Sequence, residues 1–169
     1  AHHSIPTVRT LSVEEWMSDP IPCLARLDGL GKQQGMVYVE STLPDVFDFL
    51  VEYIPPKVIA RYHIGRIGSV YEVIAVQHAV PREEQKKDGK PYLVSIRIRD
   101  GLPLDIPSEA DCYAVEAMAA LRMDYGAVEV LISDTGVYVL EINSVPELNR
   151  NLKKAYIDLF DEMYESVVK

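Results

Sequence analysis

The feature that most constrains this chain is a pair of apolar segments that carry oxygen-bearing side chains, AVEVLI (127–132) and VYVLEI (137–142). The link SDTG between them is typical of a tight turn, so the two segments are predicted to pair as antiparallel strands. Glu141 and Asn143 are two positions apart and therefore project from one face of the second strand. The turn brings Glu129 alongside them, so we expect a hairpin with three oxygen-bearing side chains on one face.

Two explanations of Glu129, Glu141 and Asn143 stay open on the pattern alone. Carboxylate and amide oxygens inside apolar strands are costly to bury without a cation, and Mg²⁺ takes such oxygens together with phosphates and water. Alternatively, an edge strand with one solvent-facing side carries its glutamates outward, which is common in antiparallel sheets. The first explanation predicts a magnesium site, and the second predicts an ordinary half-exposed strand.

The rest of the chain predicts a β-rich first part followed by an α-β-β-α order. Strands are predicted at 21–27, 36–41, 49–54, 58–65, 69–80 and 92–99. A helix is predicted to open at Pro107-Ser108, and a second, amphipathic helix is predicted to include Leu152 and Met163. This order indicates an α+β chain with antiparallel sheets.

Charge and composition exclude several classes of function. The 169 residues carry a formal net charge of −9, which argues against a nucleic-acid binder. No apolar run approaches the roughly 18 residues of a membrane-spanning helix, and the N-terminus has no apolar signal core. We therefore expect a cytoplasmic protein without a membrane partner, in which Cys23 and Cys112 are reduced core residues.

The segment ALRMDYGAVEVLISDTGVYVLEINSVPEL (120–148) resembles the C-terminal signature of ATP-grasp ligases. In that signature a carboxylate strand and a turn precede a strand that ends in Glu-x-Asn. Earlier segments resemble other parts of the family in the same order: CLARLDGLGKQQGMVYVES its basic strand, glycine-rich flap and returning strand, FLVEYIPPK its hinge, and ARYHIGRIGSVYEVIAV the strand pair that follows. The chain is most similar to short ATP-grasp proteins of tailed bacteriophages and to ligases that add glutamate to ribosomal proteins.

The resemblance implies an ATP-grasp fold in which two lobes with antiparallel sheets clamp a nucleotide. Residues 1–19 are expected to be a linker or N-terminal extension. Residues 20–100 are expected to form the first lobe with the flap, and residues 101–169 the second lobe with the metal site. The N-terminal substrate domain of full-length ligases is expected to be missing, because the chain begins with a segment that resembles the linker before the lobes.

The resemblance also implies roles for individual residues. Mg²⁺ is expected to bind Glu129, Glu141 and Asn143 and to bridge the phosphates of ATP. Arg61 and Arg97, with Arg99 as a further candidate, are expected to neutralise the transferred phosphoryl group or the substrate carboxylate. The expected nucleotide-binding residues are Arg26 near the α- and β-phosphates, Gly29, Gly31, Lys32 and Gly35 in the flap, Glu52, Tyr53 and Ile54 in the hinge, and Leu140 below the adenine.

The function that the resemblance implies is ATP-dependent amide formation, in which ATP phosphorylates a carboxylate and an amine attacks the acylphosphate. The carboxylate and the amine stay unidentified, with a protein or peptide as one acceptor class, and the oligomeric state stays open. The alternative is a truncated module that binds a nucleotide or a host protein, in the host cytoplasm if the chain is viral, without catalysing ligation. This alternative is motivated by strand 69–80, which lacks the phosphate-binding cation that relatives commonly carry. A third hypothesis is an oligomerising α+β protein with no nucleotide site.

Overall fold

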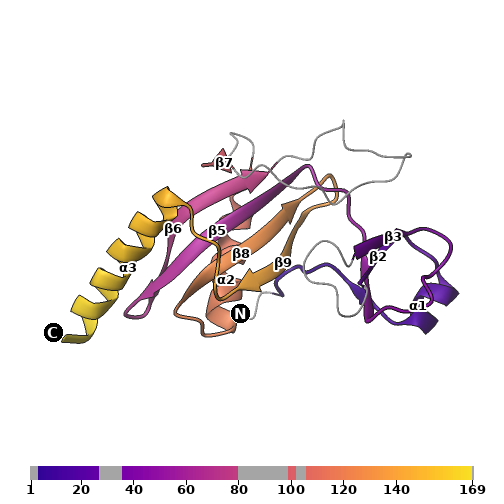
Figure 1. The fold of residues 1–169 in the computed structure, drawn as a ribbon, viewed down its shortest axis with the longest axis horizontal. Helices are drawn as coiled ribbons and strands as arrows, with labels where there is room; N and C mark the ends of the chain where they lie inside the picture. The colour runs from indigo at the N-terminus through magenta and orange to yellow at the C-terminus, as the bar shows by residue number, and fades with distance from the viewer. Residues whose placement is uncertain (1–3, 27–35, 80–98, 102–105, 169) are drawn as a thin grey trace. The chain divides into compact units, whose positions relative to one another are not determined.

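The computed structural model describes residues 4–26, 36–79, 99–101 and 106–168. These residues form two compact units, and Figure 1 labels most of their elements. In the described part of the chain, unit 1 contains residues 4–7, 56–79, 99–101 and 106–168. Unit 2 contains residues 8–26 and 36–55.

Unit 1 is built on a five-stranded antiparallel sheet in the order β7-β6-β5-β8-β9. Its strands are β5 (Val58–Ile67), β6 (Val70–Ala79), β7 (Arg99–Asp100), β8 (Tyr125–Ile132) and β9 (Val137–Asn143). Gly68, at φ 60°, adopts the left-handed conformation in the short turn that joins β5 to β6. The hairpin predicted from AVEVLI and VYVLEI is confirmed as β8 and β9, and the predicted strands at 58–65 and 69–80 are confirmed as β5 and β6.

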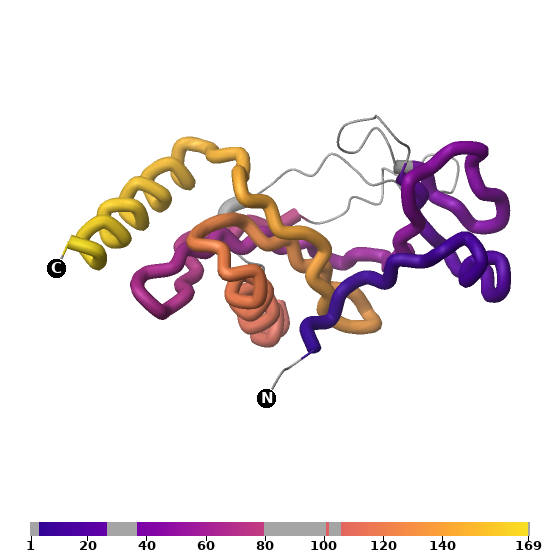
Figure 2. Tube along the Cα trace, turned by 90° about the horizontal axis from the view of Figure 1, so that it is seen from below, coloured from indigo at the N-terminus to yellow at the C-terminus, as the bar shows by residue number. Residues whose placement is uncertain are grey.

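Each face of this sheet is covered by a helix. α2 (Glu109–Ala120) packs its alanines and Met118 on one face, against buried apolar side chains of β5 and β8. α3 (Arg150–Val168) lies against β5 and β6, and its Tyr156 side chain reaches His63. Figure 2 shows α2 and α3 on opposite sides of the sheet. Both helices were predicted from the spacing of their apolar residues, and both predictions are confirmed.

A glycine sets the distance between α3 and the sheet. A Cβ atom on Gly65 of β5 would overlap the Leu159 side chain of α3. Leu159 is almost fully buried, so the helix fills the space that a side chain at position 65 would otherwise need.

Unit 2 contains a four-stranded antiparallel sheet in the order β1-β4-β2-β3. Its strands are β1 (Thr10–Leu11), β2 (Cys23–Arg26), β3 (Met36–Val39) and β4 (Phe49–Glu52). A short helix, α1 (Val13–Ser18), buries Trp16 in the core of this unit. The indole N–H of Trp16 donates to the carbonyl of Ile21 at 2.8 Å, which ties the helix to the chain that enters β2.

Residues 10–18 are not a linker in the structure, which corrects the expectation for residues 1–19. β1 pairs with β4, and α1 begins with a capping box. The Ser12 hydroxyl accepts from the backbone N–H of Glu15 at 3.1 Å, and the Glu15 carboxylate accepts from the backbone N–H of Ser12 at 2.8 Å. The spacing Ser-x-x-Glu is a recognisable helix-start signal, so the sequence carried evidence for α1 that the prediction did not use.

The two units also divide the chain differently from the expected lobes 20–100 and 101–169. β5 pairs with β8 along its length, from Val58 opposite Ile132 to Gly65 opposite Tyr125. The β5–β6 hairpin therefore belongs to the unit that contains β8 and β9, and the boundary falls near Pro55. Local patterns predict strands but not their partners, which explains the error.

The two cysteines differ in burial, which corrects half of their prediction. Cys23 is buried in unit 2, whereas Cys112 is exposed on α2, and both are free thiols. Within the described ranges, no helix is long and apolar enough to cross a membrane.

Candidate functional site

Four polar side chains form a row across the unit 1 sheet, which we call the polar row. Gln77 of β6 pairs with Arg61 of β5, Arg61 pairs with Glu129 of β8, and Glu129 pairs with Glu141 of β9. Their strand neighbours, such as Tyr62 and Val128, pack under α2. Because side chains alternate along a strand, the polar row lies on the face opposite α2.

Two β-bulges create this row. Counted outward from the tight turns, Arg61 would face Val76 and Glu129 would face Leu140. In the structure each hairpin gains one unpaired residue, Ile74 in β6 and Leu140 in β9, and the register shifts by one. The shift places Gln77 beside Arg61 and Glu141 beside Glu129, because an extra residue reverses which face the following side chains occupy.

Arg61 and Glu129 form an ion pair in the middle of the row. The Nε–H of Arg61 donates to Glu129 Oε1 at 2.9 Å, and one Nη–H donates to the same oxygen. Their side chains are 26% and 16% exposed, so water screens the pair only in part. The pair occupies one carboxylate oxygen of Glu129 and leaves the guanidinium with donors to spare.

Glu129 and Glu141, directly opposite each other on neighbouring strands, place two carboxylates side by side. Like charges in this position repel each other, and the Arg61 guanidinium beside Glu129 offsets part of that repulsion. Asn143 lies two residues beyond Glu141 on β9, opposite Ala127, and its side-chain oxygen accepts from the backbone N–H of Val145 at 2.9 Å. The structure therefore brings together the three residues predicted as magnesium ligands.

The donor set of these residues fits Mg²⁺ in kind. Carboxylate and amide oxygens are hard ligands, and magnesium takes only a few of them from protein when phosphate oxygens supply the rest. Among the described residues there is no cluster of three or more His, Cys, Asp or Glu side chains that could hold a metal without such help. The site thus suits a cation that arrives with a polyanion rather than a resident structural metal.

A buried hydrogen-bonded group beside the polar row was missed by the sequence analysis. His63, two positions from Arg61, is fully buried, and its Nδ1 lies 3.1 Å from the hydroxyl of Tyr156. Its Nε2 lies 3.3 Å from Gln77, and the Tyr156 hydroxyl donates to the carbonyl of Gly126 at 3.1 Å. Burial lowers the pKa of His63 below its usual value, and the nearby Arg61 charge acts in the same direction.

The contacts of His63 could not be read from the chain. Tyr156 is 93 positions away in sequence, and the register that would place Gln77 near His63 depends on the bulge in β6. The β-branched run around His63 predicts that it lies on a strand, but the local sequence does not predict which residues contact its side chain.

Unit 2 holds the predicted nucleotide-binding residues that lie outside unit 1. The Arg26 guanidinium carbon lies 5.9 Å from the centre of the Phe49 ring, in a cation–π arrangement. The Tyr53 ring packs edge-on against Tyr38 at 5.1 Å between ring centres. Arg26 and Phe49 are paired across β2 and β4, so the cation and the ring share one face of this sheet.

Glu52 and Ile54 lie in different surroundings from Arg26. Glu52 is paired with Cys23, and its negative charge adds to burial in raising the pKa of the Cys23 thiol. Since Cys23 faces the core of unit 2, Glu52 is on the core face, near its edge. Ile54 is buried. The structure therefore does not bring the hinge residues together on one face of the sheet.

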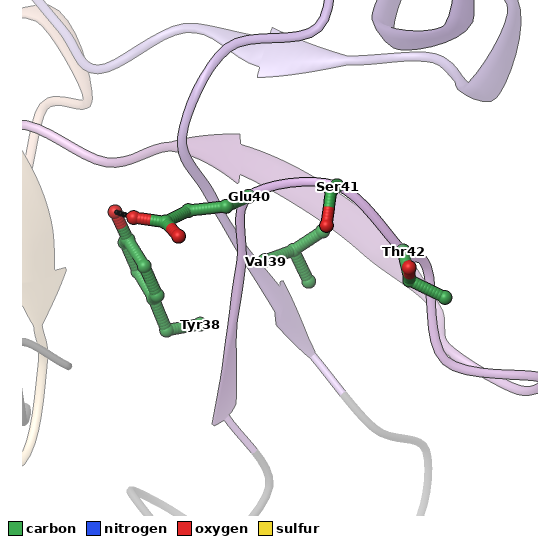
Figure 3. Close-up of a pocket in the computed structure, with 5 residues that line it drawn as sticks. All are labelled: Tyr38, Val39, Glu40, Ser41 and Thr42. Carbon is green, nitrogen blue, oxygen red and sulfur yellow. Dashed lines mark hydrogen bonds between the residues drawn. The ribbon is translucent and has the colours of Figure 1, made fainter. Parts of the chain in front are cut away.

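Figure 3 shows a polar hollow in unit 2, lined by Tyr38, Val39, Glu40, Ser41 and Thr42. The Tyr38 hydroxyl donates to the Glu40 carboxylate at 2.9 Å. Burial and this carboxylate raise the pKa of Tyr38 to about 12. The hollow contains none of the predicted site residues.

Several predicted residues lie outside the described part of the chain. These are the flap residues Gly29, Gly31, Lys32 and Gly35, and also Arg97. Leu140 is described, and it is the extra residue of the β9 bulge.

The sequence profile of the RimK-like ATP-grasp domain matches residues 97–167, which include β8, β9 and the three predicted magnesium ligands. No curated protein sequence matches the chain.

Solved structures with a similar fold cover nearly the whole chain. The ATP-grasp ligase PsnB, complexed with precursor peptide PsnA2 and AMPPNP, superposes with a TM-score of 0.63 at 14% identity, over 96% of this chain and 55% of its own. D-alanyl-alanine synthetase A from Vibrio cholerae superposes with a TM-score of 0.60 at 13% sequence identity, over 95% of this chain and 55% of its own. Macrocyclase MdnC, bound with precursor peptide MdnA from Microcystis aeruginosa, superposes with a TM-score of 0.56 at 16% sequence identity, over 94% of this chain and 56% of its own.

The chain spans about half the length of each of these structures. At such low identities they establish the fold, whereas the profile match rests on the sequence of the C-terminal part. The expected ATP-grasp fold is confirmed, and residues 97–167 match the profile of the RimK-like ATP-grasp domain.

Proposed function

We propose that the chain is a module of a Mg-ATP-dependent ligase that joins a carboxylate to an amine. The observation that carries the proposal is the polar row with Asn143 beside it. One cation and two opposed carboxylates stand on three neighbouring strands, at positions created by a bulge. Carboxylate and amide oxygens grouped in this way suit a Mg²⁺ ion that phosphate oxygens also bind.

In the proposed reaction, the protein acts by holding charge in place. Glu129, Glu141 and Asn143 hold Mg²⁺, which offsets phosphate charge when bound, and Arg61 directs a guanidinium N–H toward the transferred phosphoryl group or the substrate carboxylate. The terminal phosphoryl group passes from ATP to a carboxylate oxygen, and ADP leaves. The amine then attacks the acyl carbon, phosphate leaves, and the amine nitrogen loses a proton.

The remaining predicted residues keep proposed roles in nucleotide binding. Arg26 contributes a cation for phosphate, and the hinge supplies backbone groups for adenine. The proposed nucleotide-binding set also includes Leu140, Glu52, Tyr53, Ile54 and the flap residues Gly29, Gly31, Lys32 and Gly35. Arg97 keeps its proposed role with Arg61, toward the transferred phosphoryl group or the substrate carboxylate.

Peptides are the first substrate class to test. Two of the structurally similar proteins, the ligase PsnB and the macrocyclase MdnC, were solved with a precursor peptide. For this chain we propose a peptide carboxylate or amine as one of the joined groups.

The test compares binding and turnover in two matched variants. Glu141→Gln removes a carboxylate of the polar row, and Glu116→Gln removes one from α2, on the opposite face of the sheet. Mg-ATP at a hundredfold excess over its dissociation constant should stabilise the native protein by about 2.7 kcal/mol. We expect Glu116→Gln to keep this gain in thermal stability and Glu141→Gln to lose most of it.

Turnover separates a ligase from a module that only binds. ADP release that requires both an acceptor peptide and Glu141 supports ligation. Stabilisation by Mg-ATP without ADP release supports the second candidate, a nucleotide-binding module, which the engagement of Arg61 by Glu129 favours. Equal stabilisation of both variants by Mg-ATP contradicts the proposed metal site.

A further inference from the structure

The outer surface of α3 carries an apolar stripe that the sheet does not cover. Ile157, Phe160, Tyr164 and Val167 are 59%, 44%, 70% and 83% exposed. They are spaced by three and four residues and so form one line along the helix. The buried residues of α3, Leu152, Tyr156 and Leu159, lie on a different line and hold the helix to the sheet.

The stripe continues toward the helix N-terminus with basic residues. Arg150 and Lys153 extend the same spacing, so the line reads Arg150, Lys153, Ile157, Phe160, Tyr164 and Val167. This alternation of threes and fours is the heptad pattern of a helix that packs against another helix.

Charge is divided between the two halves of α3. Arg150, Lys153 and Lys154 are exposed in the first half. From Asp158 onward the exposed charges of the helix are all acidic, at Asp158, Asp161, Glu162 and Glu165. Lys154 and Asp158 pair with each other within the helix at 2.6 Å. The remaining exposed charges are basic near the N-terminus of α3 and acidic toward its C-terminus.

We propose that α3 is the surface through which two copies of this chain associate, with the two helices antiparallel about a two-fold axis. An antiparallel pair places the basic half of each helix against the acidic half of its partner, whereas a parallel pair places like charges together. In the antiparallel register that places the two apolar stripes opposite each other, Ile157 contacts Phe160 of the second copy. In the same register, Lys153 lies over the Tyr164 ring of the second copy. The alkyl stem of lysine covers apolar surface there while its charge faces the ring and nearby carboxylates.

A second copy fits this surface better than a lipid membrane does. Helices that lie on membranes carry basic residues along the whole polar edge, and the acidic second half of α3 would be repelled by anionic lipid. A single helix pair buries a small area, so the association is expected to be weak and dependent on concentration.

Sedimentation velocity of the whole chain over a hundredfold range of concentration tests the association. We expect a monomer–dimer equilibrium that weakens with added salt, and dissociation constants raised about tenfold or more by Phe160→Asp and by Ile157→Asp. Leu121→Asp, a matched change at an exposed apolar residue of unit 1 outside α3, should leave the equilibrium unchanged. Circular dichroism checks that each variant is folded; Ile157 makes none of the ring contacts of Phe160, so its variant stands if Phe160→Asp unfolds.

Orientation is tested by charge exchange and by distance. Lys153→Glu should weaken the dimer, and adding Asp161→Lys should restore it. A spin label on Val167→Cys in a Cys112→Ser background should report a backbone separation of about 25 Å in the antiparallel pair, against about 10 Å in a parallel one. Cys23 is buried and does not compete for the label.

Four results overturn the proposal. One is a monomer at every concentration, and another is a dimer that Phe160→Asp and Ile157→Asp leave intact. The third is a short distance between labels at position 167. Binding of α3 to anionic vesicles in place of self-association also overturns it.

Discussion

The two faces of the unit 1 sheet are made from alternate residues of the same strands, and they differ in what holds them together. Under α2, Ala60, Tyr62, Ile64, Val128 and Val130 are excluded from water and their shapes fill the layer. On the other face, charged and amide side chains stand in a row, and two carboxylates oppose each other. The face under α2 stabilises the fold by close packing. On the polar face, the opposed carboxylates lower stability but form an arrangement that suits a bound cation.

The largest expected effect comes from moving a charge to the apolar face. Val130→Asp buries a carboxylate with no cation beside it, and we expect it to lower the free energy of unfolding by more than about 4 kcal/mol. Val130→Ala, the control for lost volume, should cost about 2 kcal/mol. Urea denaturation followed by circular dichroism measures both, and a folded Val130→Asp protein as stable as Val130→Ala would contradict the contrast between the faces.

The contact between α3 and the polar face is broken by a single methyl group. Gly65→Ala places a Cβ against the Leu159 side chain, which should cost about 1–3 kcal/mol because the helix must shift. Leu159→Ala removes the atoms that are overlapped, so the double variant should be more stable than the sum of the two single effects predicts. Strict additivity in thermal unfolding would show that Gly65 is not needed for the close approach.

Buried His63 on the polar face should make the free energy of unfolding depend on pH. In the unfolded chain His63 takes up a proton as pH falls through about 6.5, while in the folded protein its lowered pKa keeps it neutral. The free energy of unfolding should therefore decrease as pH falls below about 6.5 toward that lowered pKa. His63→Gln should show a smaller decrease over the same range in urea titrations; identical pH dependence in the two proteins would rule out this contribution.

The ion pair in the polar row should contribute modestly. A double-mutant cycle with Arg61→Ala and Glu129→Ala is expected to give a coupling energy of about 1 kcal/mol, because the pair is partly screened by water. Arg61→Ala alone should cost more than Glu129→Ala, since it leaves two opposed carboxylates without their cation. Thermal unfolding at low and high salt measures both, and the reverse order would mean that Glu129 and Glu141 do not repel each other.

The smallest effect is expected at Glu141. Without Mg²⁺, Glu141→Gln should change the free energy of unfolding by no more than about 0.5 kcal/mol, because the Glu141 side chain is exposed to water. A loss of several kcal/mol in a chemical denaturation series would place Glu141 among the residues that support the fold.

Local signals account for the part of the fold that sequence could predict. The turn SDTG and its flanking apolar runs predicted β8 and β9, and helical spacing predicted α2 and α3. Strand alternation predicted that Glu141 and Asn143 share a face, whereas their position beside Glu129 depends on the bulge at Leu140. Their roles as magnesium ligands stay predictions.

What sequence did not predict depends on contacts between distant segments. The pairing of β5 with β8 joins residues sixty or more positions apart and moves the unit boundary to Pro55. Tyr156 reaches His63 from a helix at the far end of the chain. Neither contact leaves a local trace, unlike the Ser12–Glu15 capping box, which was visible and overlooked.

The bulge at Leu140 has a consequence for how this protein tolerates change. β9 is two half-strands of opposite phase, since its residues before Leu140 contribute to the core layer and those after it carry Glu141 and Asn143. Loss of one residue at the junction would act like a frameshift, turning every later side chain to the wrong face. An inserted residue further along β9 would restore the correct face only for the residues that follow the insertion. Insertions and deletions in this strand should therefore be far less tolerated than substitutions.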